Sequence, residues 1–185
     1  STIVVGVIDS GIDLTHPDLV PNLWTNRGEI PANGIDDDLN GSIDDVHGYD
    51  FVNRDGDPSD DNGHGTHCAG VIAARGDDGV GVAGVNWRLQ VMAIKFLNYA
   101  GSGISSNAVL SLQYAVRNGC RLTSNSWGGG PASQAMLDAI RAAGAAGHLF
   151  VAAAGNAGSD NDAFAVFPAS YPSDNVLAVA ATDHA

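Results

Sequence analysis

The sequence is poor in basic residues, has two cysteines and contains no long apolar run. Its 8 Lys and Arg residues stand against 21 Asp and Glu residues, which gives a formal net charge of -13 at pH 7. Because such a chain repels phosphate groups, its charge argues against nucleic acids and anionic membranes as partners and favours cations. The apolar runs are too short to cross a bilayer, and residues 1–5 lack the pattern of a signal peptide.

Cys68 and Cys120 are too few for a disulfide framework, and their spacing does not decide whether they form a single bridge. The cellular compartment therefore cannot be inferred from cysteine usage. Of the 185 residues, 44% are hydrophobic and 16% are charged, and 24 are glycines. These values argue against a disordered chain and predict one compact, turn-rich domain over residues 1–185.

Short apolar runs alternate with helical patterns along the chain. Runs of this kind, rich in β-branched residues and alanine, are typical of parallel strands that are buried on both faces. Their alternation with helices predicts a three-layer α/β fold, with a mostly parallel sheet and helices on both of its faces. The predicted strands cover residues 2–8, 89–96, 121–125, 149–153 and 176–181.

Two of the predicted helices have clear start signals. The first is expected to have Ser105 or Ser106 as its N-cap and to end at Asn118-Gly119, and the second follows Ser133. Residues 28–62 follow neither helical nor strand periodicity, and their Asp, Asn, Gly and Pro content predicts a long functional loop. The apolar faces of the helices consist of Val109, Leu112 and Val116, and of Met136, Leu137 and Ile140.

The first predicted strand leads into an aspartate, in the motif Val7-Ile8-Asp9-Ser10-Gly11. Open α/β sheets place their functional residues at the carboxyl ends of parallel strands. The alternative is a turn aspartate that accepts hydrogen bonds from nearby backbone N–H groups. A dinucleotide-binding loop fits poorly, because Gly6 and Gly11 do not make the Gly-x-Gly-x-x-Gly spacing.

A second motif is Asn62-Gly63-His64-Gly65-Thr66-His67-Cys68-Ala69-Gly70. Its glycines allow a helix to begin with the His64 imidazole unobstructed, and its small residues permit close packing on the sheet. His64 and His67 suggest metal ligands about one helical turn apart, but the His-Glu-x-x-His pattern is absent and no third ligand is evident. We expect a functional role for His64 and structural roles for His67, His47 and His148.

A third motif, Val151-Ala152-Ala153-Ala154-Gly155-Asn156, ends a strand in a glycine and a neutral amide donor. An asparagine at this place can direct its side-chain N–H groups toward a developing oxyanion. The alternative for Asn156 is a turn residue whose side chain bonds to its own backbone. The three motifs together are far more specific than any one of them.

In this order, Asp9-Ser10-Gly11, His64-Gly65-Thr66-His67 and Ala154-Gly155-Asn156 resemble the signatures of subtilisin-like serine endopeptidases. The resemblance runs from the first strand to the last residue. It implies hydrolysis of peptide bonds in a polypeptide substrate, and it implies secretion. Gly101-Ser102-Gly103 is similar to the family segment that pairs with extended substrate, and Ser126-Trp127-Gly128 to the segment that borders a substrate pocket. The alternatives are a flexible turn and, for Trp127, a core aromatic.

The resemblance also implies roles for single residues. His64 would be the general base, Asp9 would fix its tautomer and stabilise the imidazolium, and Asn156 would donate to the tetrahedral oxyanion. Ala153 and Gly155 would contact the substrate beside the two segments named above. Cys68 follows the histidine motif as in some family members, and we expect this small helical residue to pack rather than to react.

The sequence departs from the family pattern because it lacks a Gly-Thr-Ser-Met-Ala motif with the nucleophilic serine. Ser159, Ser170 and Ser173 lie in polar or proline-flanked loops. The first strand begins almost at residue one and the chain stops at Asp183-His184-Ala185, so we expect a peptidase domain that is incomplete at both ends. This chain alone is expected to be inactive, with a propeptide or the missing C-terminal segment as its partner. The alternative is a non-catalytic, calcium-binding or partner-binding remnant of the same fold.

The acidic run Asp36-Asp37-Asp38-Leu39-Asn40-Gly41 satisfies the pattern Asp-x-Asp-x-Asn-Gly, in which alternate residues turn oxygens inward. His47 occupies the position of the closing glutamate of an EF-hand, so Asp44 or Asp45 must supply the last carboxylate. Loops of this kind recur as calcium sites in some subtilisin-like enzymes. The predicted Ca²⁺ ligands are Asp36, Asp38, Asn40, Asp45 and a backbone carbonyl near Ile43.

Other interpretations of the acidic residues remain open. If it binds no cation, the loop is a solvated acidic segment. Asn40-Gly41-Ser42 is also a glycosylation sequon, although a glycan there would compete with a metal ion. A second, weaker cation site would join Asp18 to Asp78 in the loop after the His64 helix. Its alternative is a pair of unrelated surface carboxylates.

Overall fold

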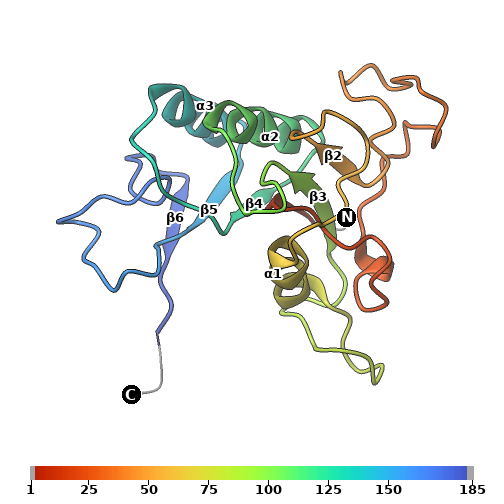
Figure 1. Cartoon of the computed structure of the whole chain (residues 1–185), viewed down its shortest axis with the longest axis horizontal. Coiled ribbons are helices and arrows are strands. Elements are labelled where there is room, and N and C mark those ends of the chain that lie inside the picture. Colours follow the sequence, from red (N-terminus) through yellow and green to blue (C-terminus); the bar gives the residue numbers. More distant parts are fainter. Residues whose placement is uncertain (1–2, 183–185) are drawn as a thin grey trace.

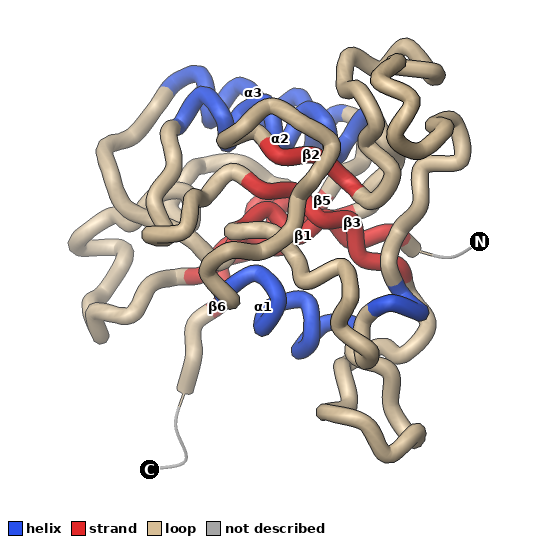
Figure 2. The backbone as a smooth tube through the Cα atoms, turned by 45° about the vertical axis from the view of Figure 1, so that its right-hand side comes forward, coloured by secondary structure: helices blue, strands red, loops and turns tan. Residues whose placement is uncertain are grey.

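The computed structural model describes residues 3–182, which form three layers (Figure 1). A parallel sheet lies between two helices on one face and one helix on the other, which confirms the predicted α/β fold (Figures 1 and 2). Thr2 of the first predicted strand, and Asp183-His184-Ala185, lie outside the described residues. The elements are β1 (Val4–Asp9), η1 (Val20–Asn22), β2 (Gly48–Asp50), α1 (His64–Ala73), β3 (Gln90–Lys95), α2 (Ser105–Arg117), β4 (Leu122–Asn125), α3 (Gln134–Ala145), β5 (Leu149–Ala153) and β6 (Val176–Val179).

The strand order within residues 3–182 is β2-β3-β1-β4-β5-β6, and every neighbouring pair is parallel. All carboxyl ends therefore lie at one edge of the sheet. Strand β1 is central, with Val5 paired to Val91 on β3 and to Leu122 on β4. The segments that follow β3, β1, β4 and β5 consequently leave the sheet side by side, in that order.

The core has two halves, one on each face of the sheet. Side chains alternate along a strand, so Val7 of β1 packs in the cluster that contains Ala69 and Ala73 of α1. Ile8 points the other way, into the cluster beneath α2 and α3 that includes Leu112. Small residues on α1 let this helix approach the sheet closely, and its first residue is His64, as predicted.

Two local predictions are wrong. Residues 28–62 are not entirely loop, because Gly48–Asp50 form β2 at the edge of the sheet, with the Phe51 N–H donating to the Lys95 carbonyl at 2.7 Å. Helix α2 begins at Ser105, and Ile104 rather than a serine occupies its N-cap position. The Ser133 cap of α3 is confirmed, since its side chain accepts from the Met136 N–H. Within residues 3–182, no helix is long and apolar enough to cross a membrane.

Candidate active site

Asp9 and His64 meet at the carboxyl edge of the sheet. Asp9 ends β1 and is 1% exposed, and its Oδ1 atom lies 2.7 Å from Nδ1 of His64, the first residue of α1. The Ser10 N–H donates to the same carboxylate oxygen at 2.7 Å. A buried carboxylate on Nδ1 favours the tautomer that carries its proton there and leaves Nε2 as an acceptor. Because the His64 side chain is 48% exposed, the ring can act on a group outside the sheet.

Asp60 holds the start of α1 against the turn that follows β1, a role that sequence reasoning missed. Its Oδ1 accepts from the Ser10 hydroxyl at 2.8 Å and from the Gly63 N–H at 2.9 Å. Its Oδ2 accepts from the hydroxyl and the N–H of Thr66, at 2.6 and 2.9 Å. Burial works to raise the pKa of Asp60, but these hydrogen bonds outweigh burial and lower the pKa to about 2. The ionised Asp60 carboxylate thus holds the start of α1, and with it His64, against the turn after β1.

The glycine after His64 is required by close packing. A Cβ atom on Gly65 would lie 2.1 Å from the Gly11 carbonyl oxygen and 3.1 Å from Cβ of Asp9. The Gly65 N–H instead donates to the Ser10 hydroxyl at 2.9 Å. The sequence motif therefore has a steric reason: only a residue without a side chain lets α1 begin this close to β1.

Cys68 lies one turn below His64 on α1, with its Sγ atom 4.0 Å from His64 Nδ1. It is partly buried against the core cluster of α1, as expected for a packing residue, and burial raises the pKa of its thiol. Cys68 and Cys120 are both free thiols. Burial also raises the pKa of Cys120, to about 12, so neither thiol is favoured as a thiolate.

Asn156 follows β5, the second strand along from β1 in the sheet order. It is exposed and lines an open hollow together with Gly155 and Val166. Within the described part of the chain its amide makes no hydrogen bond, so the turn alternative, in which the amide bonds to its own backbone, is not what the structure has. The Asn156 amide is accessible to a ligand at the carboxyl edge of the sheet.

Gly101, Ser102 and Gly103 follow β3 in an ordered turn. The Asn98 N–H donates to the Ser102 carbonyl at 2.9 Å, and the Asn98 side chain accepts from the Ser102 N–H at 3.1 Å. A Cβ on Gly103 would lie 2.5 Å from the Phe96 carbonyl oxygen, so this segment runs close over the end of β3.

Ser126, Trp127 and Gly128 follow β4 on the other side of Asp9. Trp127 packs edge-on against Phe96 at 4.8 Å and against Phe150 at 6.4 Å, measured between ring centroids. It thus contributes to the core, and it also lines a small hollow beside Met136. Its indole N–H is buried without a hydrogen-bond partner in the described residues.

The acidic loop brings together a carboxylate set that differs from the predicted one. One oxygen from each of Glu29, Asp36 and Asp38 lies within 4.8 Å of the others. Glu29 is 7% exposed, and its Oε1 atom accepts from the backbone N–H groups of Asp37 and Asp38 at 2.9 and 3.2 Å. Sequence reasoning missed Glu29, because it precedes the motif by seven residues and lies outside its pattern.

Asp45 is fully buried, and both its oxygens accept hydrogen bonds. Oδ1 accepts from the Asn26 amide at 2.8 Å, and Oδ2 from the Asn40 amide at 2.9 Å and the Tyr114 hydroxyl at 2.5 Å. Burial raises the pKa of Asp45, against these hydrogen bonds. Asp45 therefore anchors the loop to α2 and is not part of the Glu29 cluster, while Ile43 is half exposed.

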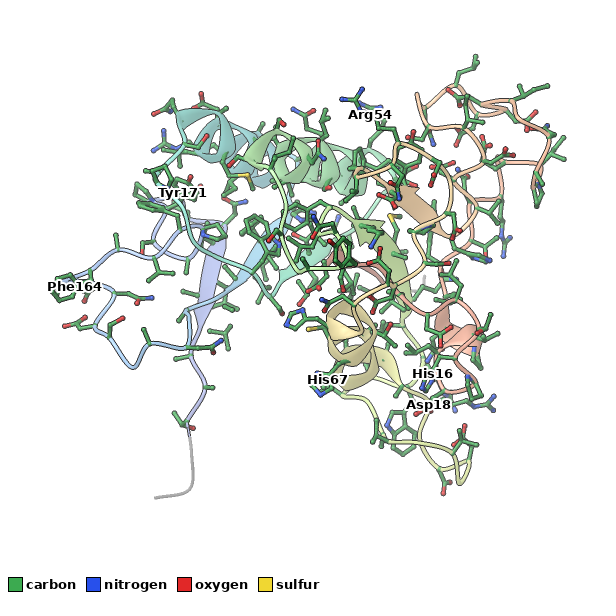
Figure 3. The ribbon with its side chains drawn as sticks, in the orientation of Figure 1. His16, Asp18, Arg54, His67, Phe164 and Tyr171 are labelled. Atoms are coloured by element: carbon green, nitrogen blue, oxygen red, sulfur yellow. The ribbon has the colours of Figure 1, made fainter. Side chains whose placement is uncertain are left out.

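Asp18 is buried against the loop that follows α1 (Figure 3). Its Oδ2 atom accepts from the Val82 N–H at 2.9 Å, whereas Oδ1 is buried with no hydrogen-bond partner within residues 3–182. Asp78, its predicted companion, uses its carboxylate to accept from the Val80 N–H at 3.0 Å. An unpartnered buried carboxylate oxygen is costly, so this position suits a cation.

The predicted structural histidines differ from one another. His148 is buried between the Thr123 hydroxyl at 3.1 Å and the Cys120 carbonyl at 3.0 Å, as expected. His47 contacts the Trp24 carbonyl at 2.9 Å, which also fits a structural role. His67 is exposed on α1 and makes no side-chain hydrogen bond in the described part of the chain, so its predicted structural role is wrong (Figure 3).

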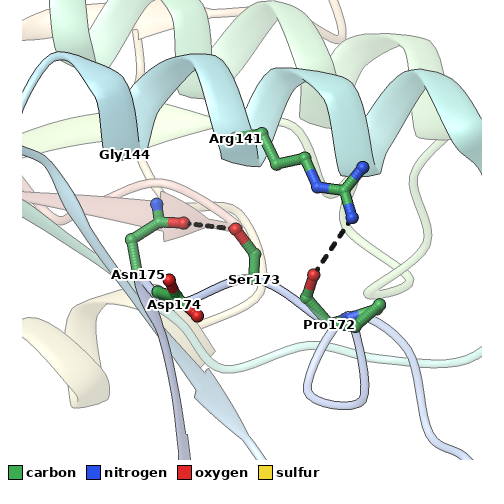
Figure 4. Close-up of a pocket in the computed structure, with 6 residues that line it drawn as sticks. All are labelled: Arg141, Gly144, Pro172, Ser173, Asp174 and Asn175. Carbon is green, nitrogen blue, oxygen red and sulfur yellow. Dashed lines mark hydrogen bonds between the residues drawn. The ribbon is translucent and has the colours of Figure 1, made fainter.

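A further hollow lies beside α3, at the amino ends of the strands rather than at the carboxyl ends where Asp9 lies (Figure 4). It is formed by α3 and the residues that precede β6, and Arg141 donates to the Pro172 carbonyl at 3.3 Å. The Asn175 amide donates to the Ile140 carbonyl at 2.9 Å, which ties this segment to α3. Because these residues lead into the amino end of a parallel strand, the hollow is remote from the Asp9 edge.

Comparison with known proteins identifies a family and several relatives of this chain. Residues 1–185 match the family described as the Subtilase family. Subtilisin-like protease 1 of Plasmodium berghei (strain Anka) is 37% identical over 156 residues, which cover 84% of this chain and 26% of the relative. Thermitase of Thermoactinomyces vulgaris is 34% identical over 179 residues, 97% of this chain and 54% of the relative. Subtilisin DY of Bacillus licheniformis is 37% identical over 184 residues, 99% and 57% respectively.

Proposed function

This chain belongs to the subtilase family, and we propose that it supplies the aspartate, the histidine and the oxyanion-binding asparagine of a serine-type endopeptidase. The family and the relatives support a serine protease that acts on a polypeptide substrate. The observation that carries the finer proposal is the 2.7 Å contact between Asp9 Oδ1 and His64 Nδ1. A carboxylate behind an exposed imidazole is the arrangement that a general base requires.

In the proposed reaction, His64 removes the proton from a serine hydroxyl through Nε2 and later returns it to the leaving amine. Asp9 holds the proton on Nδ1 and stabilises the imidazolium that forms. The Ser10 N–H keeps the Asp9 carboxylate in line by donating to Oδ1. Asn156 donates its exposed amide to the oxyanion of the tetrahedral intermediate.

We propose that an extended substrate lies over the carboxyl edge of the sheet. Residues 101–103 and 126–128 follow β3 and β4, which flank β1, so they stand on either side of Asp9. Ala153 and Gly155 follow along β5 and its loop, next to Asn156. The order of these segments supports a substrate channel with the Asp9–His64 pair at its centre.

The sequence has no Gly-Thr-Ser-Met-Ala motif, so the proposed nucleophile belongs to a further segment that pairs with this chain. Without a serine hydroxyl, His64 has no proton to remove. For subtilisin, loss of the serine reduces turnover by roughly a millionfold. Hydrolysis of a peptide anilide by the 185-residue chain alone, abolished by His64→Ala, would show a different nucleophile.

The triad assignment is tested in the full-length protein. Asp9→Asn is expected to lower kcat by roughly 10⁴-fold, because an amide favours the wrong imidazole tautomer, while the fold is kept. Asp57→Asn is the control, since within residues 3–182 its exposed carboxylate accepts hydrogen bonds only from Ser59. If Asp9→Asn retains near-full turnover in peptide anilide hydrolysis, Asp9 is not part of the triad.

We propose that the acidic loop binds Ca²⁺ through Glu29, Asp36 and Asp38. Carboxylate oxygens are the hard ligands that calcium prefers, and these three would supply part of its shell of six to eight oxygens. Three carboxylates this close repel one another unless a cation lies among them. Asn40 and Asp45 hold the loop in shape through hydrogen bonds, and we do not propose them as ligands of the ion. The ion would hold the acidic loop in one conformation. A second, separate cation position is proposed at Asp18, whose Oδ1 atom has no hydrogen-bond partner in the described residues.

Calcium binding to the folded state should raise the melting temperature as the Ca²⁺ concentration increases. Glu29→Gln and Asp38→Asn are expected to abolish most of this shift, whereas Asp57→Asn leaves it intact. Asp18→Asn is expected to remove only the part of the shift in melting temperature that comes from Ca²⁺ binding at Asp18. Calorimetry in millimolar Ca²⁺ with no heat of binding, together with an unchanged melting temperature, would contradict both sites.

A further inference from the structure

Lys95 is a charged side chain buried at the active-site edge of the sheet. It ends β3 and is 2% exposed. Its Nζ atom donates to the Ser10 carbonyl at 2.7 Å, to the Leu97 carbonyl at 3.1 Å and to Asp61 Oδ1 at 2.5 Å. These contacts use all three donor hydrogens of the ammonium group.

The three acceptors belong to three segments that build the site. Ser10 follows Asp9, and its N–H donates to the Asp9 carboxylate. Asp61 lies between Asp60 and the His64 helix, and Leu97 leads from β3 into residues 101–103. Lys95 is also the register partner of Asp9 in the sheet. One buried cation therefore joins the turn after Asp9, the loop before His64 and the segment proposed to pair with substrate.

Burying an ammonium group costs more free energy than burying an apolar side chain of similar volume. Removing a charge from water costs several kcal/mol in proteins, and an apolar side chain of similar volume often fills such a position without loss of stability. The charged groups beside Lys95 include Asp61, which is 47% exposed and forms an ion pair with it, and its two buried register partners, Asp9 of β1 and Asp50 of β2. Because the ammonium makes directional bonds to two backbone carbonyls, it fixes geometry that an apolar residue would not.

We propose that Lys95 is a positioning residue that keeps Asp9 and His64 in the geometry needed for proton transfer. It acts through its neighbours: the Ser10 carbonyl fixes the peptide whose N–H orients Asp9, and Asp61 fixes the loop that leads to His64. Without the ammonium, the Asp9–His64 contact loosens while the sheet stays folded. The inference rests on the proposed peptidase function, but its main readout does not need turnover.

The test compares Lys95→Met, Lys95→Arg, Asp61→Asn and the control Asp57→Asn in the full-length protein. The first readout is the low-field proton resonance of His64 Nδ1–H in its hydrogen bond to Asp9, followed with the His64 titration by NMR. The other titratable group beside this ring is Cys68. Lys95→Met is expected to broaden or remove the resonance and to lower kcat by about 100-fold, with a much smaller change in KM. Asp61→Asn should give a smaller effect of the same kind, and Lys95→Arg a partial rescue.

A folded Lys95→Met variant with an unchanged resonance, His64 titration and kcat would overturn the proposal, since Lys95 would then only fill space. If Lys95→Met fails to fold, Asp61→Asn decides, because its side chain is half exposed and its loss leaves the core intact. An unchanged resonance in Asp61→Asn would then overturn the proposal. Wild-type protein that shows the resonance but hydrolyses no peptide contradicts the proposed function and leaves the positioning role measurable.

Discussion

His64 Nδ1 lies 2.7 Å from Asp9 Oδ1, although the two residues are 55 positions apart in the chain. The contact depends on how closely the first turn of α1 approaches the end of β1. Ser10 and Asp60 join these two elements by hydrogen bonds, and Gly65 removes the side chain that would keep them apart. The geometry of the pair is thus set by its neighbours as much as by its own two side chains.

Gly65→Ala should break the close approach of α1 to β1. The added Cβ would collide with the Gly11 carbonyl, so we expect a loss of about 1–3 kcal/mol in the free energy of unfolding and loss of the Asp9–His64 contact. Gly70→Ala on the same helix meets nothing within 4 Å and should stabilise the protein by about 0.5–1 kcal/mol. Urea unfolding of both variants provides the comparison, and equal effects would refute this account of Gly65.

Asp60→Asn should remove a stabilisation that depends on pH. The folded-state pKa of Asp60 is about 2, below its ordinary value of 3.8, so the carboxylate stabilises the fold fully above about pH 4. This contribution is lost as the pH falls from about 4 to 2. We expect Asp60→Asn to lose about 1 kcal/mol at neutral pH, after allowance for solvent screening of a partly exposed group, and to converge with wild type near pH 2.

The measurement for Asp60 is thermal unfolding between pH 2 and 7, in wild type, Asp60→Asn and the exposed control Asp57→Asn. The control should follow wild type at every pH. A constant difference between Asp60→Asn and wild type across the whole range would argue against the linkage.

His148 should make the protein less stable in mild acid. Burial lowers the pKa of His148 below 6.5, so the folded state keeps the ring neutral while the unfolded chain takes up a proton. The stability conferred by the neutral ring is complete above about pH 6.5 and decreases as the pH falls below it. His148→Gln should therefore flatten the change in melting temperature between pH 7 and 5. His67→Gln, on the exposed face of α1, should retain the wild-type slope, and an equal slope in both variants would contradict the assignment.

Leu112→Ala should cost about 2–5 kcal/mol in the free energy of unfolding, because Leu112 is completely buried between α2 and the sheet. Leu110 on the same helix is 47% exposed, and Leu110→Ala should stay within about 0.5 kcal/mol of wild type. Chemical unfolding of the two variants tests which face of α2 is the core face. Similar losses would show that α2 packs differently.

Most strands were predictable because short apolar runs rich in β-branched residues are typical of parallel strands buried on both faces of a sheet. The edge strand β2 was not, since it has three residues and no periodicity to detect. Only the structure shows why residue 48 of this strand is a glycine: a Cβ there would lie 1.7 Å from the Ala93 carbonyl oxygen of β3. The N-cap of α2 was misassigned because a serine at a helix start resembles a cap, whereas the extended residue Ile104 precedes the helix here.

The supporting residues of the site were not predictable from motifs. Asp60 acts on Ser10, 50 positions away, and Lys95 acts on the same residue from 85 positions away. Glu29 joins Asp36 and Asp38 through a loop whose path follows no regular period. Each looks like an ordinary polar residue in the sequence, because its partners come close only when the chain folds. The sheet does this for Asp60 and Lys95, and the path of the loop does it for Glu29.

The sequence by itself determined the fold class and the family, and it identified Asp9, His64 and Asn156 as candidates, because these depend on local periodicity and on short motifs. Only the tertiary structure decided that β1 lies between β3 and β4, that Asp9 touches His64, and that Lys95 and Asp60 support the pair. The physical reason is that strand order and close contacts arise from packing both faces of the sheet at once. No stretch of the chain specifies that packing alone.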